Sequence, residues 1–250
     1  NAPARPGRRV MLDDETLRDG LQSPSVRTPS IAQKLRMLHL IDSLGMYTIM
    51  RPGPYICAEV DFGGFPPWLA NVPNIKIRGT NTQYLEAVDA MYGKIIPIIA
   101  KHQITNGGSV IVVQVENEHF SGNAPYQKHL VDKIHSLGVT VPYIWSMINN
   151  NTSYDPGAFP PLATKGFMTE QWIGWIGRYG PPPTADRNTY SNQTWRMLGS
   201  GSGGTSHYMT IGGTNFGYTA SPDQRITSYD YGSPIGELGQ LRQGLFMVKQ

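Results

Sequence analysis

Runs of hydrophobic residues alternate along the chain with segments in which hydrophobic residues recur every three to four positions. The runs predict buried parallel strands, and the spaced segments predict amphipathic helices. Six strands are indicated, near residues 9–13, 46–50, 109–115, 141–147, 166–169 and 207–212. Alternating strands and helices favour a parallel sheet, so we expect an α/β fold of the (β/α) TIM-barrel type. A closed barrel has eight strands, and fewer than eight regular strands are visible here.

Helices are expected over residues 30–44, 81–102, 124–137, 190–198 and about 236–249. Thr28 or Ser30 can cap the first of them, Gly45 can end it, and Asn81 or Thr82 can cap the second. The predicted buried faces are Ile31, Leu35, Leu38 and Ile41 in the first helix, Leu85, Val88, Ile95 and Ile99 in the second, and Leu238, Leu241, Leu245 and Val248 in the last.

Length and composition indicate one globular domain over residues 1–250. A chain of 250 residues is as long as one barrel, and 16% charged residues with a net charge of +3 are not typical of disorder. No basic stripe with interleaved aromatic residues is present, so nucleic-acid binding is not expected. No hydrophobic segment approaches the ~18 residues of a membrane span, and no leader segment is visible. Cys57 is the single cysteine, so no intrachain disulfide can form.

Two of the predicted strands end in carboxylates. The run over 109–115 is followed by Asn117 and Glu118, and the run over 166–169 by Glu170, with Trp172 and Trp175 close behind. At the C-terminal ends of barrel strands such residues are typically catalytic. A retaining glycosidase needs a general acid and a nucleophile about 5–5.5 Å apart. Glu118 suits the acid, because burial behind its strand favours the protonated form.

We therefore assign Glu170 as the nucleophile, with Trp172 and Trp175 available to stack on a sugar ring and Asn117 able to bind a sugar hydroxyl. The alternative is structural, because Glu116 and Glu118 could be strand-end residues paired with arginine. Two classes of group are not expected: the residues predict neither a cofactor nor a metal in the site. The oligomeric state is left open by the sequence.

From residue 46 onward the chain resembles the retaining β-galactosidases of glycoside hydrolase family 35. The resemblance rests on ordered motifs, which are Arg51-Pro-Gly-Pro-Tyr-Ile-Cys-Ala-Glu59, Gly63-Gly-Phe-Pro-Pro-Trp68, Asn106-Gly-Gly108, Gln114-Val-Glu-Asn-Glu118, Thr169-Glu170, Gly212-Gly-Thr-Asn-Phe-Gly217 and Thr227-Ser-Tyr-Asp-Tyr231. It implies that Glu118 is the acid/base and Glu170 the nucleophile. It also implies a β-galactoside substrate, small or oligosaccharide, in a pocket lined by Cys57, Ala58, Glu59, Asn117 and Tyr231. Family members are often secreted or lysosomal.

The N-terminus has a different resemblance. Leu12-Asp-Asp-Glu-Thr-Leu-Arg-Asp-Gly-Leu-Gln22 is similar to the first strand and loop of the DRE-TIM metallolyases, the group that contains isopropylmalate and homocitrate synthases. That resemblance implies that Arg18 and Asp19 descend from a substrate and metal site, although the His-x-His pair of the family is absent. We interpret residues 1–45 as a metallolyase-like βα unit, residues 46–250 as galactosidase-like, and the chain as an engineered chimera with its seam near Gly45–Met50.

Two alternatives to galactosidase activity remain, one raised by the spacing of the glutamates and one by the N-terminal motif. Glu118 and Glu170 lie 52 residues apart, whereas three βα units of about 31 residues would separate the corresponding family strands. This difference predicts that the chain is shortened around residues 148–165. The first alternative is a non-catalytic barrel scaffold with a misaligned sugar site. The second is a metal-dependent aldol-type lyase that uses Arg18 and Asp19.

Overall fold

The computed structural model describes residues 27–57, 61–119, 123–145, 167–172, 174–176, 195, 199, 204–214 and 228–242. Several predictions fall outside these residues. They are the strand near 9–13, most of the helix near 190–198, the Arg18-Asp19 pair, and the substrate-pocket candidates Ala58 and Glu59.

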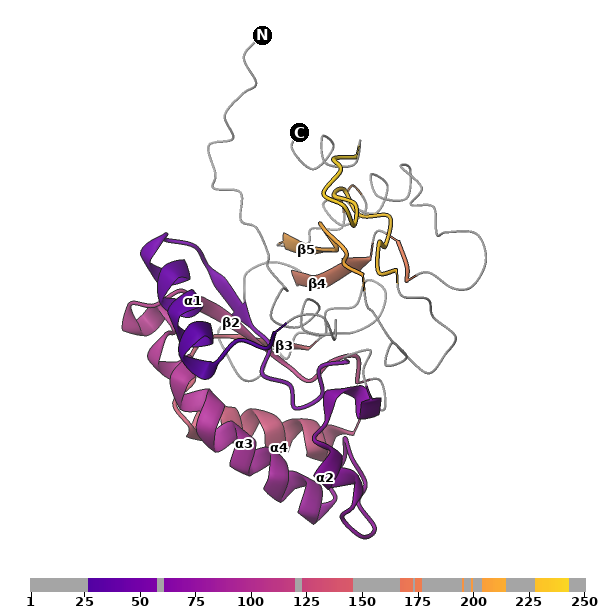
Figure 1. The fold of residues 1–250 in the computed structure, drawn as a ribbon. Helices are drawn as coiled ribbons and strands as arrows, with labels where there is room; N and C mark the ends of the chain where they lie inside the picture. Colours follow the sequence, from indigo (N-terminus) through magenta and orange to yellow (C-terminus); the bar gives the residue numbers. More distant parts are fainter. Residues whose placement is uncertain are drawn as a thin grey trace.

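Parallel strands and helices alternate through the first part of the chain, as an α/β fold requires (Figure 1). The elements in order are α1 (Ile31–Ser43), β1 (Thr48–Met50), η2 (Asp61–Gly64), α2 (Pro67–Ala70), α3 (Thr82–Lys101), η3 (Ile104–Asn106), β2 (Val110–Val115), α4 (Ala124–Ser136), β3 (Tyr143–Trp145), β4 (Phe167–Trp172) and β5 (Gly204–Tyr208). β1, β2 and β3 form one parallel sheet in that order, and β4 and β5 form a second parallel pair.

β2 is the central strand of the first sheet, which explains its hydrophobic sequence. It pairs with β1 from Thr48↔Val110 to Met50↔Val113, and with β3 from Val113↔Tyr143 onward. Five of its six residues are buried. Strands pair with β2 on both edges and helices cover the sheet, so few of its side chains meet water. The strand predicted over 109–115 is thus confirmed within one residue.

α3 and α4 lie side by side against this sheet (Figure 1) and supply most of its hydrophobic core. Asn81 caps α3 by accepting a hydrogen bond from the Tyr84 amide at 3.1 Å, and Asn123 caps α4 in the same way. The α3 residues in the core are Tyr84, Val88, Tyr92, Ile96, Ile99 and Ala100, and the α4 residues are Tyr126, Leu130, Val131 and Ile134. The prediction that Ile95 points inward was wrong: it is 36% exposed, because it lies one helical step from the Tyr92–Ile96–Ile99 stripe.

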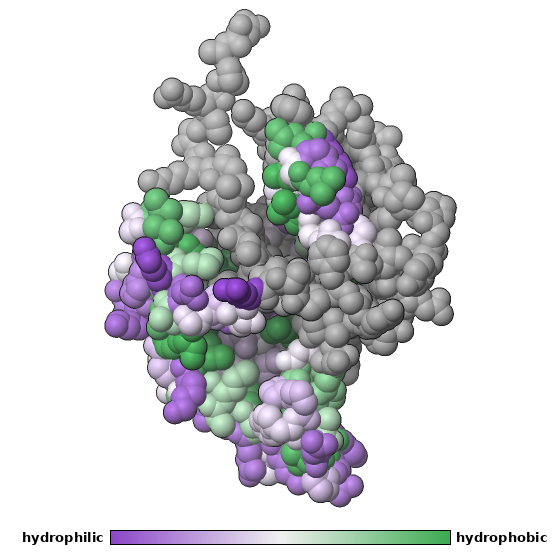
Figure 2. Space-filling model, in the orientation of Figure 1, coloured by the Kyte–Doolittle hydropathy of each residue, from purple (hydrophilic) through white to green (hydrophobic). Residues whose placement is uncertain are grey.

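α1 begins as predicted but is covered much less than predicted. Ser30 forms a capping box with Gln33, and Gly45 with φ +64° ends the helix region. Of the expected buried face only Leu38 is buried, whereas Ile31 is 74% exposed. Figure 2 shows hydrophobic surface in the part of the molecule where α1 lies. Tertiary packing, which the hydrophobic period alone does not specify, accounts for the difference.

β4 and β5 anchor a second, smaller core. β4 extends to Trp172, three residues further than predicted, so Glu170 lies inside the strand rather than after it. β5 covers Gly204–Tyr208, whereas the strand was expected over 207–212. The core comprises Ile176, Tyr208, Met209, Tyr229 and Tyr231. Three of these five residues are tyrosines and Trp172 packs against them, so aromatic rings dominate this core. No helix in the described part of the chain is long and apolar enough to cross a membrane.

The C-terminal helix predicted over about 236–249 is contradicted over residues 236–242. These residues form a tight turn, with the Gly239 amide bonded to the Gly236 carbonyl at 2.8 Å and an antiparallel bridge between Ile235 and Leu241. Leu238 is 93% exposed. Two glycines in four residues, one of them at φ +81°, weaken a helix more than the leucine spacing favours it. Residues 243–249 lie outside the described part.

An ion pair between Asp230 and Arg242 stabilises this turn, and from it we expect the stability of the protein to depend on pH. Hydrogen bonds from the Arg242 guanidinium lower the pKa of Asp230 below its ordinary value. A carboxyl whose folded pKa is depressed stabilises the fold above its unfolded pKa and loses that contribution as the pH falls through the folded value. We expect Asp230→Asn to lower the melting temperature at pH 6 and to differ little from the parent near pH 2. Asp132→Asn, in an exposed pair, is the control, and equal deficits at both pH values would contradict the assignment.

Candidate active site

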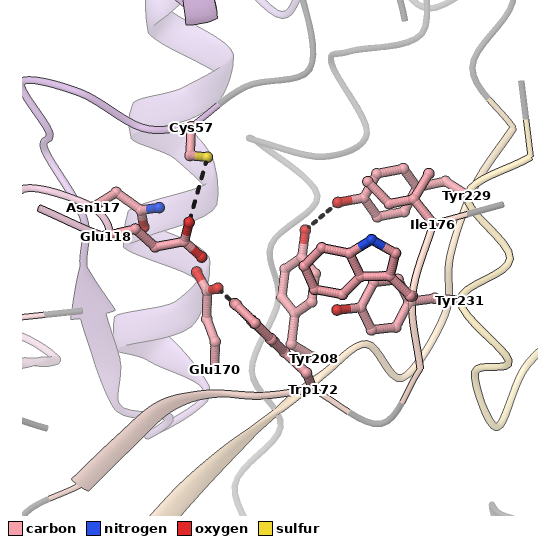
Figure 3. A pocket seen from close by; sticks show the side chains of 10 residues that line it. Cys57, Asn117, Glu118, Glu170, Trp172, Ile176, Tyr208, Tyr229 and Tyr231 are labelled. Carbon is pink, nitrogen blue, oxygen red and sulfur yellow. Dashed lines mark hydrogen bonds between the residues drawn. The ribbon is translucent and has the colours of Figure 1, made fainter. Parts of the chain in front are cut away.

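One cavity brings the two predicted catalytic carboxylates together. It encloses about 110 Å³ and is lined by Cys57, Asn117, Glu118, Glu170, Trp172, Trp175, Ile176, Tyr208, Tyr229 and Tyr231. Figure 3 shows Glu118 and Glu170 directed toward one another from opposite sides. Glu118 follows β2 and Glu170 comes from β4. Residues 52 positions apart thus meet in space.

Of the eight site residues predicted from the sequence, all six that the structure describes line this cavity. They are Cys57, Asn117, Glu118, Glu170, Trp172 and Tyr231. The prediction omitted Ile176, Tyr208 and Tyr229 from the site. Tyr229 belongs to the motif that ends at Tyr231, and this could have identified it. Nothing in the sequence distinguishes Tyr208 from other strand tyrosines.

The backbone after β2 adopts an uncommon conformation that separates neighbouring glutamates. Glu116 and Glu118 have φ values of +62° and +47°, in the left-handed region that non-glycine residues rarely adopt. Cys57, opposite Glu118, has φ +54°. Such conformations cost of order 1–3 kcal/mol each and concentrate at functional sites. The result is that Glu116 joins a buried polar network while Glu118 lines the cavity.

Glu116 is a structural residue paired with an arginine, as the structural alternative predicted for it. Its side chain is 1% exposed and accepts hydrogen bonds from Arg78 Nη2 at 2.8 Å, the Tyr126 hydroxyl at 2.7 Å and the Asn117 amide at 2.8 Å. Arg78 also donates to the Asn117 carbonyl and lies 3.9 Å from the centre of the Tyr55 ring. A buried carboxylate saturated by donors fixes the turn that precedes Glu118.

Arg51 connects the two sides of the cavity and was not assigned as a site residue from the sequence. Its Nη2 donates to Asn117 Oδ1 at 2.6 Å and also to Glu170 Oε1. Trp172 Nε1 donates to the other oxygen of Glu170 at 3.1 Å. The side chain of Glu170 is only 7% exposed. A cation and an N–H donor on a buried carboxylate favour its ionised form, which is the form that a nucleophile needs.

An aromatic wall completes the cavity beside Glu170. The rings of Trp172 and Trp175 meet edge to face with centroids 4.9 Å apart, and those of Tyr229 and Tyr231 stack at 5.9 Å. The hydroxyls of Tyr208 and Tyr229 are 2.7 Å apart. Rings with hydroxyl groups at their edges offer both an apolar surface and hydrogen bonds, which matches the two-sided chemistry of a sugar.

Cys57 contacts the other carboxylate. Its Sγ lies 3.9 Å from Glu118 Oε2, and the residue is partly exposed at the cavity (Figure 3). Cys57 is therefore a pocket residue and not a cysteine buried in the hydrophobic core. A thiol is a weak, uncharged donor, so this contact can orient Glu118 without adding a charge of its own.

Two carboxylates facing each other beside an aromatic wall are the arrangement found in enzymes that cleave glycosidic bonds. The family model described as "Glycosyl hydrolases family 35" matches residues 30–152 and 140–250. The chain therefore belongs to glycoside hydrolase family 35. The match begins at residue 30, so α1 lies inside it.

Curated relatives support the same assignment. The chain is similar to "Probable beta-galactosidase 2" of Dictyostelium discoideum, with 33% identity over 238 residues that cover 85% of this chain and 31% of the relative. It is 32% identical over 245 residues to the "Beta-galactosidase" of Homo sapiens, covering 85% of this chain and 36% of the relative. The mouse "Beta-galactosidase" is 31% identical over 246 residues, with 85% and 38% covered. The chain spans about a third of the length of these relatives.

Proposed function

We propose that this protein is a retaining glycoside hydrolase that acts on terminal β-galactosides. The single observation that supports this most strongly is the pair Glu118 and Glu170, which face each other in one cavity although β2 and β4 belong to different sheets. A retaining mechanism needs a general acid and a nucleophile on either side of one glycosidic bond, and this cavity holds a carboxylate for each role. The substrate class that we propose, a β-galactoside, rests on the names of its relatives.

The roles that we propose follow from the groups beside each carboxylate. Glu170, with Arg51 and Trp172 on its oxygens, attacks the anomeric carbon while Glu118 gives its proton to the glycosidic oxygen. The aglycone leaves as an alcohol, and the sugar remains bonded to Glu170. A water molecule then gives a proton to Glu118 and attacks the same carbon, which releases galactose in the β configuration and restores both side chains.

The remaining predicted residues are proposed as the galactose pocket. Asn117, oriented by Arg51 and by Gln114 at 3.1 Å, would bind a hydroxyl next to the reacting carbon. Trp172 and Tyr231 would contact the apolar face of the ring, and Cys57 would approach it beside Glu118. Ala58 and Glu59 follow Cys57 in the sequence and are proposed for the same pocket.

We also propose that residues 1–250 form one (β/α) barrel-type domain with a shortened middle. The two family matches overlap over residues 140–152, which reaches into the 148–165 segment where the glutamate spacing predicts missing sequence. The metallolyase-like origin of the N-terminus remains a proposal for the residues before the match. A match that starts at residue 30 supports a seam earlier than Gly45–Met50.

Hydrolysis of 4-nitrophenyl β-galactoside by the purified protein tests this function. We expect turnover of the β-galactoside and a lower kcat/KM for the matching β-glucoside, which differs only at the 4-hydroxyl. Proton NMR of the first product formed should show β-galactose, since the reaction retains configuration. A cooperatively melting protein with no turnover would instead support the non-catalytic scaffold. α-Galactose as first product would exclude a retaining mechanism.

A further inference from the structure

Three possible metal ligands converge on the side of the fold away from the predicted catalytic residues. His39 and Asp42 lie three residues apart on α1, and His102 is the C-cap residue of α3. Each offers one nitrogen or oxygen atom, and these atoms all lie within 4.8 Å of one another. We propose that His39, Asp42 and His102 form a binding site for a divalent transition-metal ion of the Zn²⁺ type. The sequence predicted no metal for the catalytic site, and this one is separate from it.

The donor set defines the class of ion. Two imidazole nitrogens and one carboxylate oxygen suit Zn²⁺ and its neighbours, which such sites hold with three protein ligands and a water molecule. Mg²⁺ and Ca²⁺ prefer all-oxygen ligands, so they are expected to bind weakly. The negative end of the α3 dipole, where His102 lies, adds a favourable term for any cation.

The distances are close to those that a bound ion requires. Ligand atoms at about 2.0–2.1 Å from one Zn²⁺ lie roughly 3.3 Å apart in a tetrahedron. His102 Nδ1 and Asp42 Oδ2 are 2.7 Å apart and share a hydrogen bond, so this pair opens slightly when the metal replaces the shared proton. His39 is exposed, and rotation of its side chain can close a gap of up to about 1.5 Å, the difference between the 4.8 Å limit and the tetrahedral spacing. Its ring already lies edge to face against that of His102, with centroids 4.9 Å apart.

The site would cross-link two elements that otherwise share little hydrophobic packing. Leu38 is the one buried residue of α1, whereas His102 is 7% exposed beside the core helix α3. Metal binding to the folded protein alone raises its stability in proportion to the logarithm of the free metal concentration. The ion would therefore fasten α1 to the sheet and α3.

Isothermal titration of the metal-free protein with ZnCl₂ tests the proposal. We expect one saturable site per chain, a melting temperature that rises with Zn²⁺, and no comparable effect of MgCl₂. His39→Ala removes an exposed ligand without disturbing the core, and it should weaken binding at least about tenfold, the loss that even an outer-shell partner causes. Asp42→Asn should do the same.

His129→Ala is the matched control. His129 and Asp89 also pair a histidine with a carboxylate, at 2.9 Å, but Lys133 Nζ lies 3.4 Å from the same carboxylate and opposes a cation there. This variant should bind Zn²⁺ as the parent does. No saturable binding by the parent, or equal affinity in His39→Ala and the parent, would overturn the proposal.

Discussion

Replacement of Glu170 by alanine is expected to lower kcat for 4-nitrophenyl β-galactoside by more than about a thousandfold, because it removes the nucleophile that we propose. Folding should persist, although Arg51 loses one partner, because Asn117 still accepts from it. Turnover and a thermal melt on the same preparation check both statements. Glu86→Gln, on the exposed surface of α3, is the control and should retain parental rates. A Glu170→Ala protein with an undiminished rate would refute the assignment.

Azide distinguishes the roles of Glu118 and Glu170, because the two alanine variants are expected to form different products with it. In Glu170→Ala, azide can take the place of the missing nucleophile and attack the substrate once, which gives α-galactosyl azide. In Glu118→Ala the galactosyl-enzyme still forms from a substrate with a good leaving group, and azide attacks that intermediate to give β-galactosyl azide. The opposite pair of products would show that the roles of Glu118 and Glu170 are exchanged.

Arg78→Met is expected to destabilise the protein by about 3–5 kcal/mol, because it leaves the buried carboxylate of Glu116 without its cation. Urea unfolding at pH 7 measures the loss. Lys128→Met, in an exposed pair with Asp132, is the matched control and should change the free energy of unfolding by less than about 1 kcal/mol.

The double variant Arg78→Met/Glu116→Gln makes this prediction specific to the charge. Replacing Glu116 by a neutral residue removes the uncompensated charge, so the double variant should be more stable than Arg78→Met alone. If it is less stable, shape rather than charge explains the role of Arg78. If the folded double variant still loses activity, the turn that leads to Glu118 has moved from its parental position.

Local signals in the sequence predicted the elements around β2 well. The Val/Ile run, the Ser30 and Asn81 caps and the end of α1 at Gly45 each depend on only a few neighbouring residues, and the structure agrees with each prediction. The site was predictable for a related reason, because the polar residues stand where hydrophobic strands end. Six of the candidates share the cavity.

What the sequence could not supply depends on contacts between distant segments. The exposure of Ile31 depends on which residues cover α1, and the period of its hydrophobic residues carries no information on that point. The turn at 236–242 follows from glycines that outweigh a leucine repeat. Arg51 belongs to a recognisable motif, but its link to Glu170 joins residues 119 positions apart, and only a folded chain brings them together.

That link has a consequence for how this family can tolerate changes in chain length. The guanidinium of Arg51 contacts Asn117, next to Glu118, and Glu170 at the same time. One planar guanidinium group therefore helps to set the distance between the two carboxylates, whatever the number of residues between them in the sequence. Segments between the strands could be lost or exchanged while this molecular spacer preserved the reach from one glutamate to the other.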